Sequence, residues 1–141
     1  MSLEFIDTNV LVYAHQRGAG VKHSRAVELV SRLIREDGAA LSIQVLTEFY
    51  AAAVRKLGMS SQEAEAIVSD FGVCTIHRPA HTDLIHAARL HRRHHLSWWD
   101  ALILNSALEL DCRLLWTEDF TDGRRFGSLA VRNPFRHQDI A

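Results

Sequence analysis

The sequence predicts an α/β domain in which helices cover both faces of a mainly parallel sheet. Short apolar segments alternate with amphipathic helical segments along the chain, and this alternation is typical of parallel strands joined by crossover helices. The 141 residues give room for one hydrophobic core, and no Pro- or Gly-rich linker divides them. We therefore expect a single domain over residues 1–141.

The first half of the chain holds two expected strands and three expected helices. Polar residues 7–9 end the first apolar segment and suit the cap of the helix that follows. The next helix repeats apolar residues at helical spacing and ends at Asp37 and Gly38, and the third ends at Gly58. In chain order these elements are strand 3–6, helix 10–15, helix 24–35, strand 39–43 and helix 44–57.

The second half continues the same rhythm. Ser60 or Ser61 caps a helix, Pro79 opens the next, and Ser97 caps the last. The polar segment 117–119 ends a short apolar strand, and a polar loop follows. In chain order these elements are helix 61–71, strand 73–76, helix 79–94, helix 98–110, strand 114–116, loop 122–128 and strand 129–131.

Composition excludes several classes of protein. With 16 Lys+Arg against 17 Asp+Glu, the net charge of -1 excludes a uniformly basic coat for nucleic acid, although it leaves local patches open. Cys74 and Cys112 lack the spacing of a zinc site or a disulfide framework, so we expect both to be buried packing residues. No apolar stretch approaches the ~20 residues of a membrane helix and the N-terminus lacks the pattern of a signal peptide, so we expect a cytoplasmic protein without membrane association.

Acidic residues follow the strands at the edge where ligands bind. In open parallel sheets this is the edge formed by the carboxyl ends of the strands. Asp7 follows the first strand, Glu48 lies in the second turn of the helix after strand 39–43, Asp100 lies in the first turn of the last helix, and Asp119 follows strand 114–116. We expect these four acids to meet.

The surroundings of two of these acids favour a metal ion. Glu48 and Asp100 have apolar residues three and four positions away along their helices, so both carboxylates lie on or beside the buried face. Two carboxylates about 4 Å apart repel each other by roughly 4 kcal/mol at an effective dielectric constant near 20. An oxygen-only ligand set suits Mg²⁺ or Mn²⁺, and such ions promote phosphodiester hydrolysis.

Four segments resemble the motifs of the PIN-domain family, in particular the VapC-type toxins of bacterial toxin-antitoxin pairs. They are FIDTNVL at residues 5–11, LTEF at 46–49, SWWDALI at 97–103 and WTEDF at 116–120, in the family's order and with fitting spacing. The resemblance implies a PIN-like three-layer α/β/α fold with a central, mainly parallel sheet. It also implies a Mg²⁺- or Mn²⁺-dependent endoribonuclease that acts as a toxin.

The resemblance further implies roles for individual residues and partners. The metal-site acids would be Asp7, Glu48, Asp100 and a fourth acid, for which Asp119 is our prediction over its neighbour Glu118. Asn9 and Thr117 would support the acids or a bound water. The family also implies a homodimer and a small antitoxin protein that inserts a peptide, often with a basic side chain, into the acidic site.

Two other functions remain open. Asp7 also fits the nucleophile of an aspartyl phosphatase of the haloacid dehalogenase type, but that family usually has a second Asp where Asn9 stands, and the sequence offers no persuasive catalytic Lys. A non-catalytic module that binds RNA or a partner protein is the third possibility, against which acids at all four positions count.

Simpler structural roles exist for the acids as well. Asp7 could serve only as the N-cap of the first helix. Asp100 could form a capping box with Ser97, and residues 118 and 119 could be ordinary turn residues. Glu48 has the weakest structural explanation and therefore gives the strongest indication of a metal site.

Basic side chains occur in two segments that could contact RNA phosphates. Arg92 and Arg93 belong to a His- and Arg-rich helix end, and Arg124 and Arg125 to the predicted loop near the C-terminus. A solvated helix end and a plain surface loop explain them equally well. Trp98 and Trp99 could stack on bases, but core or dimer contacts are more typical for both.

Overall fold

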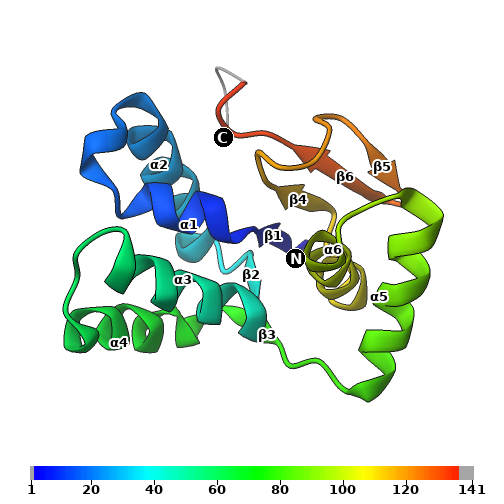
Figure 1. Cartoon of the computed structure of the whole chain (residues 1–141). Coiled ribbons are helices and arrows are strands. Elements are labelled where there is room, and N and C mark those ends of the chain that lie inside the picture. The colour runs from blue at the N-terminus through cyan, green and yellow to red at the C-terminus, as the bar shows by residue number, and fades with distance from the viewer. Residues whose placement is uncertain (1, 137–141) are drawn as a thin grey trace.

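A six-stranded sheet forms the centre of the protein (Figure 1). The computed structural model describes residues 2–136, and the strands lie in the order β3-β2-β1-β4-β6-β5. Every neighbouring pair is parallel except β5 and β6. The strands are β1 (Glu4–Ile6), β2 (Ala39–Ser42), β3 (Thr75–His77), β4 (Leu114–Trp116), β5 (Arg125–Phe126) and β6 (Leu129–Arg132). The predicted α/β class with a mainly parallel sheet is confirmed.

Six α-helices flank the sheet. They are α1 (Thr8–Ala14), α2 (Val21–Arg35), α3 (Ile43–Arg55), α4 (Ser61–Asp70), α5 (His81–His94) and α6 (Trp98–Glu109). Helices α1 to α4 gather on one side of the sheet, whereas α5 and α6 pack against each other on the other side (Figure 1). Because both faces are covered, the central strands β1, β2 and β4 are buried along their whole length, and Phe5, Leu41 and Leu115 are fully buried.

Polar caps set the helix starts that the sequence predicts. The side chain of Asp7 caps α1, Ser97 caps α6, and Ser60 caps α4 in a reciprocal capping box with Glu63. The caps at Ser60 and Ser97 account for the agreement between the expected and observed starts of α4 and α6, because each one satisfies a backbone N–H group that has no partner within the helix. Helix α1 begins at Thr8, two residues before its expected start.

Helix α2 begins at Val21, three residues before its expected start, and α5 begins at His81, two residues after its expected start. Two further segments also differ from the sequence prediction. Val73 ends a short 3-10 turn (Phe71–Val73), so β3 begins two residues later than expected. The predicted loop 122–128 contains β5, which forms a tight antiparallel hairpin with β6 through Gly127, whose φ is +63°. A strand of two residues is too short to produce an alternating pattern, and so Arg125 lies in a strand and not in a loop.

The structure agrees with the burial predicted for one of the two cysteines. Cys112 is buried as predicted, but Cys74 is only partly buried, and both are free thiols. Within residues 2–136, no helix is both long enough and apolar enough to cross a bilayer.

Candidate metal centre

The candidate site lies where the order of the strands reverses. The chain passes from β1 outward to β2 and β3, and then returns to place β4 on the other side of β1. The carboxyl ends of β1 and β4 are therefore neighbours, and the backbone N–H of Asp7 donates to the carbonyl of Trp116 at 3.0 Å. Such a reversal is the usual place for a ligand in an open parallel sheet.

Asp7 is buried at this edge, with only 4% of its surface exposed. Its Oδ1 accepts a hydrogen bond from the backbone N–H of Thr8 at 2.7 Å, which is the capping role that the sequence allows. Its Oδ2 accepts from the hydroxyl of Thr117 at 2.8 Å and from the Nδ2 of Asn9 at 3.4 Å. Capping therefore accounts for one oxygen, while the second faces β4.

Asn9 and Thr117 connect Asp7 to Asp119. The Nδ2 of Asn9 donates to Asp119 Oδ2 at 3.0 Å and to Thr117 Oγ1 at 3.3 Å. The backbone N–H of Asp119 donates to Thr117 Oγ1 at 3.0 Å. These bonds hold two carboxylates on either side of one amide, which is the supporting position predicted for Asn9 and Thr117.

Glu48 approaches the same edge from α3. The hydroxyl of Thr8 donates to Glu48 Oε1 at 2.7 Å, and the Nε2 of Gln44 donates to Glu48 Oε2 at 3.4 Å. Gln44 Nε2 also donates to the carbonyl of Trp99 at 3.3 Å, so α3 is linked to the first turn of α6. Thr8 and Gln44 were not predicted as site residues, although the spacing of four between Gln44 and Glu48 marks them as neighbours on one helix face.

Asp100 enters the site from the first turn of α6. Its backbone N–H donates to Ser97 Oγ at 3.1 Å, so the predicted cap is present. Its carboxyl also interacts with the charges of Asp119 and Glu48, which makes it part of the site at the same time.

Electrostatics shows that the four acids share one environment. Burial raises the pKa of Asp7 from 3.8 to about 7, with further contributions from the negative charges of Asp119 and Asp100, while hydrogen bonds from Thr117 and Thr8 oppose the shift. Burial also raises the pKa of Asp100, and the charges of Asp119 and Glu48 add to this effect. The neighbouring carboxylates therefore make ionisation of Asp7 and of Asp100 less favourable.

No basic side chain compensates these charges. Between residues 2 and 136, none of the four acids forms an ion pair with Lys, Arg or His. Glu4 provides the contrast at the opposite end of β1, because this buried carboxylate accepts from Arg113 at 2.8 Å, from Trp116 Nε1 at 2.8 Å and from Arg32 at 3.4 Å. One buried acid is thus paired, whereas the acids at the carboxyl edge lack a cation.

The donor set fits a divalent ion with high affinity for oxygen. Its ligand atoms are all carboxylate oxygens, which suits Mg²⁺ or Mn²⁺. Among the described residues, no three of the four acids each place an oxygen within 4.8 Å of the others. An ion held by them would keep water ligands, as Mg²⁺ usually does.

The structure distinguishes the two adjacent acids after β4. Glu118 accepts from the hydroxyl of Tyr13 at 2.8 Å and pairs with Lys22 Nζ at 2.9 Å. The negative charge that acts on Asp7 and Asp100 is that of Asp119. Asp119 is therefore the acid that the structure brings close to Asp7, and its role as the fourth metal ligand stays a prediction.

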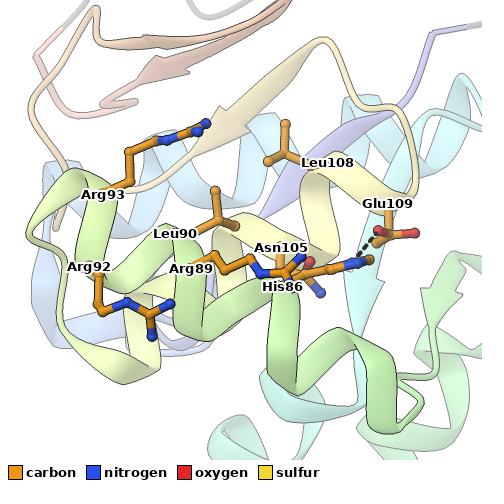
Figure 2. Close-up of a pocket in the computed structure, with 8 residues that line it drawn as sticks. All are labelled: His86, Arg89, Leu90, Arg92, Arg93, Asn105, Leu108 and Glu109. Carbon is orange, nitrogen blue, oxygen red and sulfur yellow. Dashed lines mark ion pairs between the residues drawn. The ribbon is translucent and has the colours of Figure 1, made fainter.

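The predicted RNA-contacting residues lie around α5. Arg92 and Arg93 line a cavity of about 580 Å³ between α5 and α6 (Figure 2). Arg124 donates to the carbonyl of His94 at 3.3 Å and stacks its guanidinium 4.7 Å from the ring of Phe126, so it has a structural partner. Arg125 is exposed on β5.

Trp99 does not occupy the core. Its side chain is 62% exposed and Trp99 precedes Asp100 in the chain, so of the two contacts expected for it the core contact is wrong, while a dimer contact stays a prediction. Trp98 is partly buried, with its ring edge-on to His91. Residues 98–104 are apolar apart from Asp100, so hydrophobic periodicity alone does not show which side of α6 is exposed.

The comparison with known proteins gives one family and several similar structures. Residues 5–122 match the family described as PIN domain. Among solved structures, FitAB bound to an IR36 DNA fragment has a TM-score of 0.71 at 19% identity, covering 99% of this chain and 100% of the other. No curated protein is similar enough in sequence to be counted as a relative.

Two further structures are similar over most of the chain. A toxin-antitoxin complex from Klebsiella pneumoniae has a TM-score of 0.67 at 19% identity, covering 93% of this chain and 97% of the other. VapC20 of Mycobacterium tuberculosis, a toxin that cleaves the sarcin-ricin loop, has a TM-score of 0.66 at 20% identity, covering 83% and 92%. These likenesses concern the fold.

Proposed function

This chain belongs to the PIN-domain family, and we propose that it is a Mg²⁺- or Mn²⁺-dependent endoribonuclease that hydrolyses RNA phosphodiester bonds. One observation carries the proposal. Four acids from four segments lie close enough at the carboxyl edge of β1 and β4 for their charges to interact, since Asp119 and Asp100 act on Asp7 and Asp119 and Glu48 act on Asp100. None of the four forms an ion pair with a basic side chain among residues 2–136. Family membership favours this activity over the aspartyl phosphatase alternative.

In this proposal the acids hold the ion and their neighbours fix the acids. Asp7, Glu48, Asp100 and Asp119 would be the ligands, and a bound divalent ion would supply Lewis acidity to the scissile phosphate and to an attacking water. Thr8 orients both Asp7, through its N–H, and Glu48, through its hydroxyl. The hydrogen bonds from Thr8, Asn9 and Thr117 keep the carboxylates in place although these repel one another.

The negative charge of the four acids determines which ligands can approach the site. Without a divalent ion the edge is anionic and repels phosphate. Asn9 holds Asp119 with its amide and leaves the outer surface of this carboxylate exposed. Access of RNA to the site therefore depends on the ion, and the side chains that contact RNA must lie around the acids.

Metal-dependent cleavage of labelled RNA tests the proposal. We expect wild-type protein to cleave RNA with Mg²⁺ or Mn²⁺ and not with EDTA, and we expect Asp100→Asn to lose at least about a hundredfold in rate, since transition-state charge stabilisation by such ions is worth several kcal/mol. Asp111→Asn is the matched control, because Asp111 is an exposed acid just beyond the other end of α6. Equal cleavage by wild type and Asp100→Asn, or cleavage unaffected by EDTA, contradicts the proposal.

We further assign RNA contacts to Trp99 and to Arg92, Arg93, Arg124 and Arg125. In an Asp100→Asn background that does not cleave, Trp99→Ala is expected to weaken RNA binding about tenfold, since stacking of one base on an aromatic ring contributes roughly 1–3 kcal/mol. Tyr50→Ala, which removes another exposed ring, should leave the affinity unchanged. Fluorescence anisotropy with labelled RNA measures both, and equal affinities for the two variants would exclude Trp99 from the RNA site.

The biological role that we propose is that of the toxin in a type II toxin-antitoxin pair, acting in the cytoplasm. The similar structures include toxin-antitoxin complexes, and this supports an antitoxin protein as partner. An apolar groove of about 390 Å³ between α1, α2 and α4 suits an antitoxin segment, with Val27, Ile34, Ile67 and Phe71 among its lining residues. A homodimer is proposed from the resemblance to the family.

A further inference from the structure

A second group of metal-binding side chains lies between α5 and α6. Asp83 and His86 of α5 and Glu109 of α6 each bring one donor atom within 4.8 Å of the others. Figure 2 shows His86 and Glu109 pointing toward each other across the two helices, with His86 Nδ1 at 3.4 Å from Glu109 Oε1. Glu109 ends α6, whereas Asp100 begins it, so this group is about 13 Å along the helix from the candidate metal centre.

Asp83 is held as a charged carboxylate. It is only 8% exposed, and its Oδ2 accepts from the backbone N–H of Ala80 at 2.7 Å while its Oδ1 accepts from Asn105 Nδ2 at 2.9 Å. The bond from Ala80, followed by that from Asn105, lowers the pKa of Asp83. Each oxygen keeps a further lone pair, and metal-binding carboxylates are commonly fixed by hydrogen bonds of this kind.

His77 adds a fourth donor beside Asp83. It ends β3, and its Nε2 lies 3.5 Å from Asp83 Oδ1, while its Nδ1 is 2.7 Å from Ser106 Oγ on α6. In the tautomer whose Nδ1–H donates to Ser106, the Nε2 lone pair faces the carboxylate. The Nε2 lone pair and the carboxylate repel each other unless a cation lies between them. A hydrogen bond from the other ring nitrogen to a neighbouring group is usual for metal-binding His.

We propose that Asp83, His86 and Glu109 bind a Zn²⁺ ion, with His77 as the fourth donor. The mixed set of imidazole nitrogens and carboxylate oxygens favours Zn²⁺ over Mg²⁺. The spacing of three between Asp83 and His86 places both on one face of α5. Two carboxylates neutralise the ion, which links β3, α5 and α6 at the end of the helix pair away from Asp100.

Zinc binding to tag-free protein tests this site independently of nuclease activity. All buffers contain excess Mg²⁺ so that the acids at the carboxyl edge do not compete, and equilibrium dialysis measures Zn²⁺. We expect the double variant His86→Gln/Glu109→Gln to lose one bound Zn²⁺, with affinity reduced about a hundredfold or more. We also expect Zn²⁺ to raise the melting temperature of the wild type and not that of the double variant.

The matched control removes the same residue types elsewhere. His91→Gln/Glu65→Gln replaces an exposed His on α5 and an exposed Glu on α4, and it should bind Zn²⁺ as the wild type does. Circular dichroism without Zn²⁺ checks that both double variants are folded, which their partly exposed positions favour. Unchanged Zn²⁺ affinity in the His86/Glu109 variant, or equal loss in the control, overturns the proposal.

Discussion

Replacing Asp7 by Asn is expected to abolish RNA cleavage and, at the same time, to stabilise the metal-free protein at neutral and alkaline pH. The activity should fall at least about a thousandfold, because Asp7 is the most buried of the proposed ligands and several kcal/mol of charge stabilisation depend on the ion it holds. The stability should change in the opposite direction, because the buried carboxylate is costly to ionise.

The sign of the stability change follows from proton binding. In the unfolded chain Asp7 loses its proton above a pKa of 3.8, whereas in the folded protein it keeps the proton up to a pKa of about 7. Between these values the unfolded state binds fewer protons, so the free energy of unfolding falls by up to about 1.4 kcal/mol per pH unit as the pH rises. Asp7→Asn removes this loss, so without divalent ions its stability relative to wild type should be higher at pH 8 than at pH 4 by about 4 kcal/mol, which is the slope taken over the interval between the two pKa values.

Urea unfolding in EDTA at the two pH values measures this difference. Glu4→Gln is the control on the same strand, because Glu4 is equally buried but paired with Arg113 and Arg32. Its replacement should lower the free energy of unfolding by about 2 kcal/mol at pH 8, since the hydrogen bonds to charged groups are weakened. If Asp7→Asn were destabilising to the same extent as Glu4→Gln at pH 8, the carboxylate of Asp7 would have to be compensated in the fold.

Asp119→Asn and Glu118→Gln should have opposite profiles although the residues are adjacent. Asp119 lies in hydrogen-bond contact with Asn9 and its charge acts on Asp7, so its replacement should reduce cleavage by about a hundredfold. Glu118 pairs with Lys22, half of whose side chain is exposed, so its replacement should lower stability by less than about 1 kcal/mol and leave cleavage within about threefold of wild type.

Single-turnover cleavage and thermal unfolding separate these outcomes. A large loss of cleavage in Glu118→Gln, combined with normal cleavage in Asp119→Asn, would reverse the assignment of the fourth acid. Lys22→Gln serves as the control for Glu118, because it removes the other half of the same ion pair and should reproduce the small loss of stability.

The sequence alone places three of the acids at one edge because each of the three lies near an element boundary. Asp7 and Asp119 follow strands, and Asp100 follows the cap at Ser97, so their common edge follows from the topology of a parallel sheet. The bond between Thr8 and Glu48 could not be predicted, because it joins residues 40 positions apart and depends on how α1 packs on α3.

Three other features could not be predicted from the sequence, because they also depend on contacts between segments far apart in the chain or on a single turn. The pairing of Glu118 with Lys22 spans 96 positions and distinguishes it from Asp119, whereas the two acids are equivalent in the sequence. His77 and Glu109 approach Asp83 and His86 only because α5 packs on α6 and β3. Strand β5 has two residues, and its pairing with β6 is determined by the turn at Gly127.

Calorimetric titration of the protein with Mn²⁺ at pH 6 and pH 8 tests most directly whether the uncompensated acids form a metal site. The predicted result is binding that releases about one proton per ion at pH 6 and none at pH 8, because Asp7 with a pKa of about 7 must lose its proton at the lower pH. Asp100→Asn should weaken this binding about a hundredfold, and Asp111→Asn should not change it. Binding of Mn²⁺ that is equally tight in wild type and Asp100→Asn, with no proton released at pH 6, would contradict the account.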